Sequence, residues 1–475
     1  MRLHLQTDMK KFWIALFIGM LIPVKLSAQN FTLTINSSGI KADSIHFQRF
    51  TNGKEFKDTL AIPFSSKVIF KLKESIAPGQ YQVLTDTNLL FELLISDKKK
   101  QAINVQVQAN GEIIFENSVE NSNWVAYNKR LMEFNAQRES LNQQYEQAQK
   151  SMPAYMLETF VQKLIAQDEA IQKEETAYKD QVIAENPSTL LASIVAFSKA
   201  LPTPPQNIQQ NRQLLLEFYT QHDFDYYPFE DERLLNSPYY IERLREFCAK
   251  LLYMEPSTAG RYATALLTKA QISPKTYHVF FDRIEKTFGQ QGTPYYNEPI
   301  YLEILKNALN YSQLDKEHTL NCQREYNLHT LNLAGNRITD FDVQWSDGSH
   351  SKLTDVESDF ILLYFQNPDC PECTLIRGYL AENKELNKAI ESGKLKVITI
   401  YFEHDKNLWE RYLKEKADPN YMHGWDYKGE IDAKNLYDLR AIPYMFLLDK
   451  DKKIIKKDLI YSEISDYLKQ YKIVE

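Results

Sequence analysis

The chain has 475 residues, of which 43% are apolar and 25% charged; this is ordinary for a protein that folds around a core, and the length suggests about three domains. Its formal net charge of −7 gives no reason to expect nucleic acid as a partner. Four cysteines are too few for a fold held together by disulfide bonds, so a closely spaced pair among them is expected to serve chemistry.

Residues 1–28 are predicted to be a secretory signal peptide. Basic residues, among them Lys10 and Lys11, precede an apolar run of 13 residues from Phe12 to Val24, which is too short to span a bilayer. The run is followed by Leu-Ser-Ala at 26–28, which resembles a cleavage site. The sequence therefore predicts export to the periplasm or cell envelope, with an uncleaved membrane anchor as the alternative.

Residues 29–117 are predicted to form an antiparallel β-sandwich. Short runs with alternating apolar residues, such as FTLTI and SKVIFKL, recur at intervals of about ten residues. Nothing in this part of the chain has the spacing of a catalytic site.

Residues 118–328 are predicted to be all α-helical and to begin with a long helical hairpin. Apolar residues recur every three or four positions from 124 to 152 and again from 157 to 182, with Pro153 between the two runs. This hairpin, residues 121–184, is either a spacer or an arm for homodimerisation or docking. Arg138 is the one charged member of the first stripe, whereas Asp168 and Glu175 weaken the second, so a third element is expected to cover that second stripe.

Two isolated cysteines lie in the same helical region. Cys248 falls on an apolar helix face, where a cysteine is usually a small core residue. Cys322 falls in a connector, and the two could pair in an oxidising compartment. The sequence leaves both interpretations open.

From about residue 329 the pattern becomes alternating β and α, and it contains a Cys-Pro-Glu-Cys motif. The motif follows a buried strand, residues 360–365, and Pro371 occupies the first helical position, where a missing N–H costs nothing. Cys370 then lies at the positive end of the helix dipole, which favours a thiolate. Cys373 follows one turn later on the same face, so the two sulfurs can form a disulfide.

The rest of this region is predicted in order as one helix over 374–391, a buried strand KLKVITIYF, a helix containing Trp409, a hairpin and a final helix. The segment Glu403-His404-Asp405 follows the buried strand, and Asp405 is expected to cap the next helix. No metal site is expected, because a structural zinc site needs four ligands and the sequence has neither a second CxxC motif nor paired histidines. No cofactor motif is found.

Residues 329–475 resemble the thioredoxin-like domain of exported TlpA/ResA-type thiol-disulfide proteins. The matching features are the CPEC motif after a buried strand and Ala441-Ile442-Pro443 before another strand. The resemblance implies that Cys370 is the nucleophile, that Cys373 resolves the mixed disulfide, and that Pro443 is the cis-proline position, with Ile442 contacting substrate. It also implies client proteins with disulfides or thiols and a membrane electron donor, which the sequence does not identify.

Three positions depart from that family's pattern. Tyr364 stands where thioredoxins carry a buried acid, Ile376 where related reductases often carry Glu, and Asp369 where Trp is usual. Asp369 and Glu372 flank the thiol pair and by like-charge repulsion disfavour a thiolate on Cys370. A reducing rather than an oxidising thiol-disulfide oxidoreductase is therefore expected. The alternative is a non-catalytic envelope binding or structural protein in which the thioredoxin-like module holds a permanent disulfide.

Overall fold

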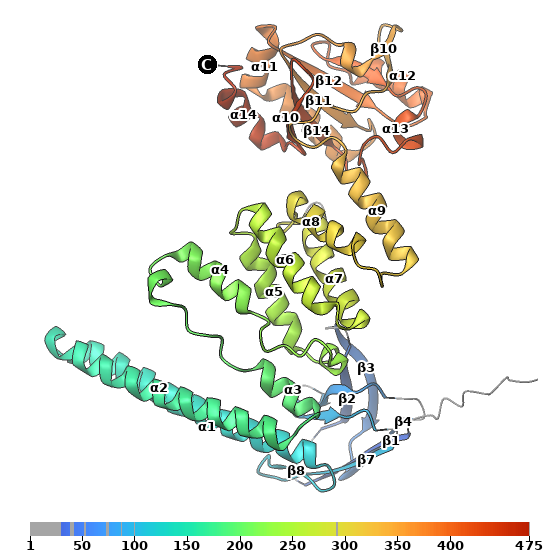
Figure 1. Ribbon diagram of the computed structural model, residues 1–475. Helices are drawn as coiled ribbons and strands as arrows, with labels where there is room; N and C mark the ends of the chain where they lie inside the picture. Colours follow the sequence, from blue (N-terminus) through green and yellow to red (C-terminus); the bar gives the residue numbers. More distant parts are fainter. Residues whose placement is uncertain are drawn as a thin grey trace, which may run out of the picture. The chain divides into compact units, whose positions relative to one another are not determined.

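The computed structural model describes residues 30–38, 42–51, 54–72, 76–86, 88–98, 100–290 and 293–474 (Figure 1). The predicted signal peptide, residues 1–28, lies outside these ranges. The described residues form two compact units: those up to Thr203 together with His222–Leu244, and Pro204–Gln221 together with those from Arg245 onward. Among the described helices, none combines the length and the apolar character needed to cross a membrane.

The N-terminal part of the first unit is a β-sandwich. Its strands are β1 (Asn30–Ser37), β2 (Ser44–Thr51), β3 (Lys54–Pro63), β4 (Lys67–Leu72), β5 (Gly79–Thr85), β6 (Leu89–Ile95), β7 (Lys100–Val107) and β8 (Ile113–Phe115). They form two sheets, with strand orders β4-β1-β7-β8 and β3-β2-β5-β6. Inward residues of both sheets, such as Leu33 and Val83, pack into one core, which confirms the predicted sandwich.

The expectation of purely antiparallel pairing is corrected at one place, because β1 and β7 pair in parallel. β1 already pairs antiparallel with β4 along its other edge, and β7 enters this sheet directly after β6 of the opposite sheet. The chain therefore changes sheets between β6 and β7, and β7 reaches the free edge of β1 running in the same direction as β1. The sequence pattern of alternating residues is the same for parallel and antiparallel neighbours.

The long helical hairpin is confirmed as α1 (Val119–Ser151) and α2 (Ala154–Glu185), which pack along each other (Figure 1). The charged residues in its apolar stripes meet across the seam. Arg138 of α1 contacts Asp168 of α2 at 3.3 Å and Glu175 of α2 at 2.7 Å. A third element, α3 (Leu190–Phe197), packs against α1 and α2, but the expected cover is incomplete, because the Asp168 side chain is 54% exposed.

The middle of the chain is helical, as predicted. Its elements are η1 (Gln206–Ile208), α4 (Arg212–His222), η2 (Glu232–Asn236), α5 (Tyr239–Leu251), α6 (Pro256–Ala270), α7 (Pro274–Gly289), α8 (Glu298–Leu309) and α9 (Lys316–Thr330). Cys248 and Cys322 are both buried as free thiols, so they do not pair in this structure. Burial raises the pKa of each thiol to about 12, which makes both unreactive near neutral pH.

The C-terminal domain is a sheet with helices on both faces. Its elements are β9 (Asp342–Trp345), β10 (His350–Lys352), η3 (Leu353–Asp355), β11 (Phe360–Gln366), α10 (Pro371–Glu382), α11 (Lys384–Glu391), β12 (Leu395–Tyr401), α12 (Lys406–Glu415), β13 (Met422–Trp425), α13 (Glu430–Ala433), β14 (Tyr444–Asp449), β15 (Ile454–Lys457), η4 (Tyr461–Glu463) and α14 (Ile464–Gln470). The strand order is β10-β9-β13-β12-β11-β14-β15. The single helix predicted over 374–391 is wrong: Asn383 ends α10 and caps α11 by accepting the Leu386 N–H.

β11 lies in the interior of this sheet and is covered on both faces. Leu363 and Phe365 point into one core, while Leu362 and Tyr364 point into the other, where they meet residues of α10 such as Ile376. A strand that is covered on both faces has a continuous run of apolar residues, and this run in the sequence predicted a buried strand here. The core on each face fixes the end of β11 and the turn that follows it.

Candidate active site

Cys370 and Cys373 lie at the start of α10, directly after β11. Cys370 is the N-cap residue, Pro371 is the first helical residue, and the Cys373 N–H donates to the Cys370 Sγ at 3.4 Å. Cys373 is completely buried, whereas Cys370 is partly exposed. The predicted positions at a helix start are therefore confirmed, and the first sulfur is the accessible one.

The buried thiol of Cys373 is held in its protonated form. Burial raises the pKa of Cys373, and the nearby Cys370 sulfur raises it further, while the backbone N–H of Asn367 acts in the opposite direction. An accessible Cys370 sulfur that accepts a backbone N–H, in front of a protonated Cys373, is the arrangement needed for nucleophilic attack followed by resolution.

The Ala441-Ile442-Pro443 segment lies at the same edge of the sheet as the thiol pair. Phe365 near the end of β11 pairs with Tyr444 at the start of β14, so the residues after β11 and those before β14 are neighbours. The peptide bond between Ile442 and Pro443 is cis, and both residues are partly exposed. Contact between a substrate and Ile442 or Pro443 remains a prediction.

Two positions that hold acids in related proteins are occupied by groups without a carboxylate. The hydroxyl of Tyr364 donates to the backbone oxygen of Cys373 at 3.0 Å, and Tyr364 is completely buried. Burial raises the pKa of Tyr364 well above its ordinary value, so this hydroxyl remains a donor. Ile376 contributes only to the core beneath α10. Tyr364 therefore fixes the backbone position of Cys373.

Cations surround the turn before Cys370, and sequence reasoning missed them. Asp369 is paired with Arg411 at 2.8 Å and with Lys416 at 3.6 Å, both from the region of α12. These two cations offset the Asp369 charge, which was expected to disfavour a Cys370 thiolate. The only sequence signal is that basic residues recur in the predicted helix around Trp409, which does not say what they face.

Arg377 of α10 also holds this turn. Its guanidinium donates to the Gln366 side chain, to the Pro368 backbone oxygen at 3.3 Å and to the Thr374 hydroxyl at 2.7 Å. The end of β11, the turn and the first turn of α10 are therefore connected through one side chain. Because the turn is already held in place by these contacts, it does not have to become ordered when a group at this position reacts.

Removing both cations beside Asp369 is expected to slow the reaction of Cys370. In a Cys373→Ser background, Arg411→Met with Lys416→Met should reduce the alkylation rate of Cys370 roughly two- to fivefold at low salt, since an exposed ion pair is worth under about 1 kcal/mol. The effect should shrink as salt is added. Adding Asp369→Asn should restore the rate. Lys406→Met is the matched control, because Lys406 pairs with Glu410 instead; an equal effect of that control would contradict the explanation.

Asp405 caps α12, as the sequence predicted. Its carboxylate accepts the backbone N–H groups of Asn407 at 2.9 Å and Leu408 at 3.1 Å. Glu403, two residues earlier, accepts a hydrogen bond of 2.7 Å from the Asn367 side chain. The end of β12 is thus tied to the turn that carries the thiol pair.

A buried ionic network connects α8 and α9 to the loop that precedes Pro443. His329 is 1% exposed, and its Nδ1 is 2.7 Å from Glu298, which also accepts from Lys457 of β15. On the other side of His329, Arg440 contacts Glu325 at 2.8 Å and Asp438 at 2.7 Å. The loop 436–443 is therefore held by side chains of the helical region.

Glu298→Gln is expected to remove about 2 kcal/mol from the free energy of unfolding, the usual worth of a buried charge-assisted hydrogen bond. Burial alone would raise the pKa of Glu298, but the hydrogen bond from His329 and the charge of Lys457 outweigh it, and the net pKa is lowered. A carboxyl group whose pKa is lower in the folded than in the unfolded state stabilises the fold at pH values above its ordinary pKa, near 4. This stabilisation is lost as the pH falls through the folded-state pKa. Urea unfolding between pH 3 and 7 should therefore show a steeper acid loss for the unmodified chain than for the variant; parallel pH profiles would contradict this role.

Comparisons with known proteins agree with this geometry. Residues 358–454 match a family model described as thioredoxin-like, and residues 163–332 match a domain of unknown function (DUF5106). The C-terminal segment is therefore a thioredoxin-like domain, and the predicted fold resemblance is confirmed. No curated protein matches the chain.

Among solved structures, a thioredoxin-like protein from Bacteroides caccae is 26% identical, with 57% of this chain and 98% of that chain covered and a TM-score of 0.53. The C-terminal domain of an uncharacterized protein from Bacteroides fragilis is 30% identical over 29% of this chain and 98% of its own, with a TM-score of 0.28. The thioredoxin domain of a thiol-disulfide oxidoreductase from Bacteroides vulgatus is 18% identical over 29% of this chain and 97% of its own, with a TM-score of 0.26. The residues after α9 are under a third of this chain, so the first likeness also includes part of the helical region.

Proposed function

We propose that this protein is an exported thiol-disulfide oxidoreductase that reduces disulfides in client proteins of the cell envelope through Cys370 and Cys373. The observation that carries the proposal is the asymmetry of the pair: Cys370 is accessible at a helix start and accepts a backbone N–H, while Cys373 is fully buried behind it. The thioredoxin-like domain supports the same chemistry.

The exchange proceeds in two steps that balance in electrons and protons. The Cys370 thiolate attacks one sulfur of a client disulfide, the client S–S bond breaks, and the departing client thiolate takes a proton from solvent. The Cys373 thiol then gives its proton to solvent, and its thiolate attacks the Cys370 sulfur of the mixed disulfide. The S–S bond between Cys370 and the client breaks, and the released client thiolate takes a proton from solvent. The client gains two electrons, and the pair is left as a Cys370–Cys373 disulfide.

The reducing direction requires a dithiol donor that returns the pair to its thiol form. A membrane protein carrying a reactive dithiol would supply it by the reverse exchange.

The test is the reduction potential of the Cys370–Cys373 couple, measured on the purified chain in defined thiol buffers, together with alkylation of the two thiols in freshly lysed cells. A potential near that of thioredoxins, about −270 mV, and a mostly alkylated pair support the proposal. A Cys248→Ser variant should give the same potential, since that thiol is buried elsewhere. A pair that stays unalkylated and resists mild reductant would identify a permanent disulfide, and a potential near −120 mV would reverse the direction.

A further inference from the structure

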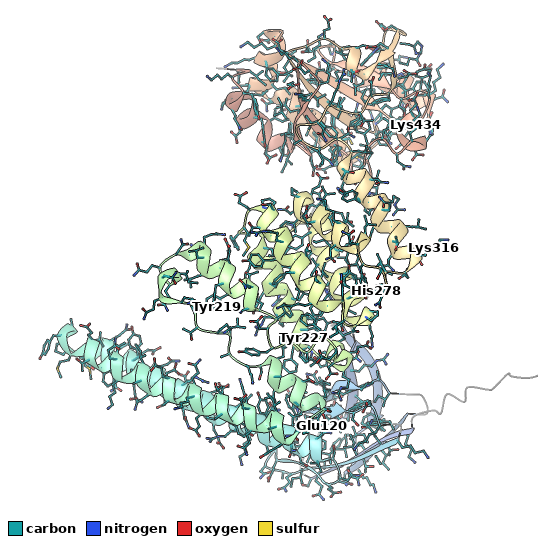
Figure 2. All side chains as sticks on the ribbon, in the orientation of Figure 1. Glu120, Tyr219, Tyr227, His278, Lys316 and Lys434 are labelled. Atoms are coloured by element: carbon teal, nitrogen blue, oxygen red, sulfur yellow. The ribbon has the colours of Figure 1, made fainter. Side chains whose placement is uncertain are left out.

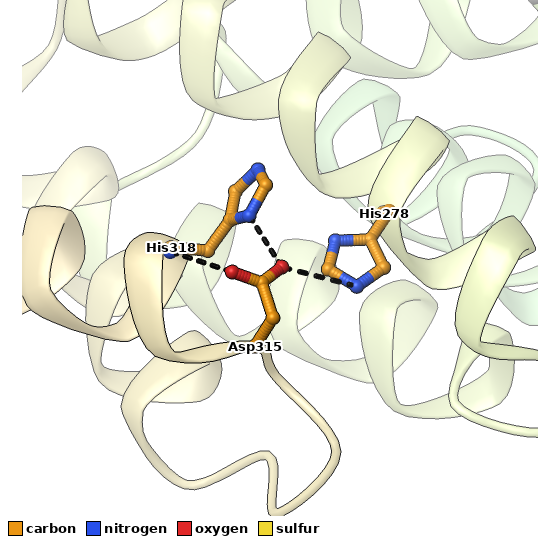
Figure 3. A group of neighbouring side chains, drawn as sticks. All are labelled: His278, Asp315 and His318. Carbon is orange, nitrogen blue, oxygen red and sulfur yellow. Dashed lines mark hydrogen bonds and ion pairs between the residues drawn. The ribbon is translucent and has the colours of Figure 1, made fainter.

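Two histidines and an aspartate from separate parts of the helical region meet at the surface. His278 lies on α7, Asp315 precedes α9, and His318 lies in the first turn of α9 (Figures 2 and 3). One nitrogen of each imidazole and one Asp315 oxygen all lie within 4.8 Å of one another. Among the residues that the structure describes, these three form the one group of histidine and carboxylate side chains that lie close enough together to share a metal ion.

The two oxygens of Asp315 have different partners. Oδ1 accepts the backbone N–H groups of Glu317 and His318, both at 3.0 Å, and so caps α9. Oδ2 faces the two rings, 2.6 Å from the Nδ1 of His318 and 4.0 Å from the Nε2 of His278. The cap explains Asp315 and His318, but it gives no reason for His278 to face the same oxygen.

The backbone on both sides of the cluster is fixed by buried aromatic residues. Tyr277, next to His278, is completely buried and lies 4.0 Å from the ring of Tyr311, which precedes Asp315 by four residues. The Tyr277 hydroxyl donates to Asn307 of α8 at 3.0 Å. These contacts hold α7 and the loop before α9 at a set separation, so the three side chains need little ordering before they bind an ion.

We propose that His278, Asp315 and His318 bind a divalent transition-metal ion, and by ligand type Zn²⁺, with water completing the coordination. Two imidazoles and a carboxylate are a common zinc ligand set with one open position. Ligands about 2.0–2.1 Å from a tetrahedral ion lie roughly 3.3 Å apart, and the present separations of 2.6 and 4.0 Å fall on either side of that value. Small side-chain rotations therefore suffice to form the site, and the ion would join α7 to α9.

The test is a calorimetric titration of the full chain with Zn²⁺, free of any polyhistidine tag. Cys370→Ser and Cys373→Ser are included so that the thiol pair cannot take the metal. One ion per chain with a micromolar or tighter dissociation constant is expected, and Co²⁺ should give the visible absorption of a low-coordinate site. His278→Ala and Asp315→Asn should each weaken binding by at least about tenfold. Asn is a good N-cap residue, so the second variant keeps α9 intact.

Two control variants separate ligation from charge. Glu317→Gln removes a neighbouring exposed negative charge, and His350→Ala removes an exposed histidine of the thioredoxin-like domain. Both should bind Zn²⁺ as the parent does. Zn²⁺ should also raise the melting temperature of the parent but not of His278→Ala. Absence of binding below millimolar zinc, or equal affinity in His278→Ala and His350→Ala, would overturn the proposal.

Discussion

Cys373→Ser is expected to accumulate as a covalent complex in which Cys370 is joined to a client protein. In the proposed exchange the accessible Cys370 attacks first, and the buried Cys373 releases the client. Turnover of a disulfide substrate should fall on the order of a thousandfold, because removal of one member of a catalytic pair removes the reaction rather than slowing one step. The measurement is non-reducing electrophoresis of cells expressing the variant, followed by identification of the trapped partners.

Cys370→Ser should trap nothing, since Cys373 is too buried to attack a protein disulfide. Cys322→Ser should behave like the unmodified chain, because its thiol is buried and its pKa is raised to about 12. Equal trapping by Cys370→Ser and Cys373→Ser would contradict the assigned order of attack. Trapping by neither variant would leave the permanent-disulfide role as the better description.

Tyr364→Ala is expected to cost about 3–5 kcal/mol in the free energy of unfolding, the usual loss for a large aromatic residue removed from a core. Tyr364 is completely buried beneath α10, and its hydroxyl holds the backbone oxygen of Cys373. The variant should also become more reactive toward alkylating agents at Cys373, because the resolving cysteine loses its support. Urea unfolding and mass-spectrometric mapping of alkylated cysteines measure the two effects.

Tyr364→Phe is the matched variant that keeps the ring and removes only the hydroxyl. It leaves the Cys373 backbone oxygen without this donor and should cost about 1–2 kcal/mol. The difference between the two variants separates the packing of the ring from the hydrogen bond. A Phe variant as unstable as the Ala variant would show that the hydroxyl, and not the ring, carries the stability, contrary to this expectation.

The sequence predicted those parts of the candidate site that depend on residues close to one another along the chain. The buried run of β11, the stop at Asn367 and Pro368, and Pro371 at the first helical position place Cys370 at the start of α10, as the structure has it. The cap at Asp405 follows from the same kind of local signal. By contrast, β13 was missed, because four residues that include Gly424 and the polar His423 carry no strand pattern of their own.

By itself, the sequence determined the β-sandwich, the long helical hairpin and the thiol pair at a helix start, because hydrophobic period, proline position and capping act between residues close in the chain. Only the tertiary structure decided that Arg411 and Lys416 offset Asp369, and that His278 faces Asp315 across α7 and α9. It also decided that Glu325 and His329 hold the loop before Pro443 through Arg440 and Asp438, and that Glu298 pairs with Lys457 of β15. Charge pairing and ligand clusters depend on distance in space, and no local period in the chain records which distant side chains will meet.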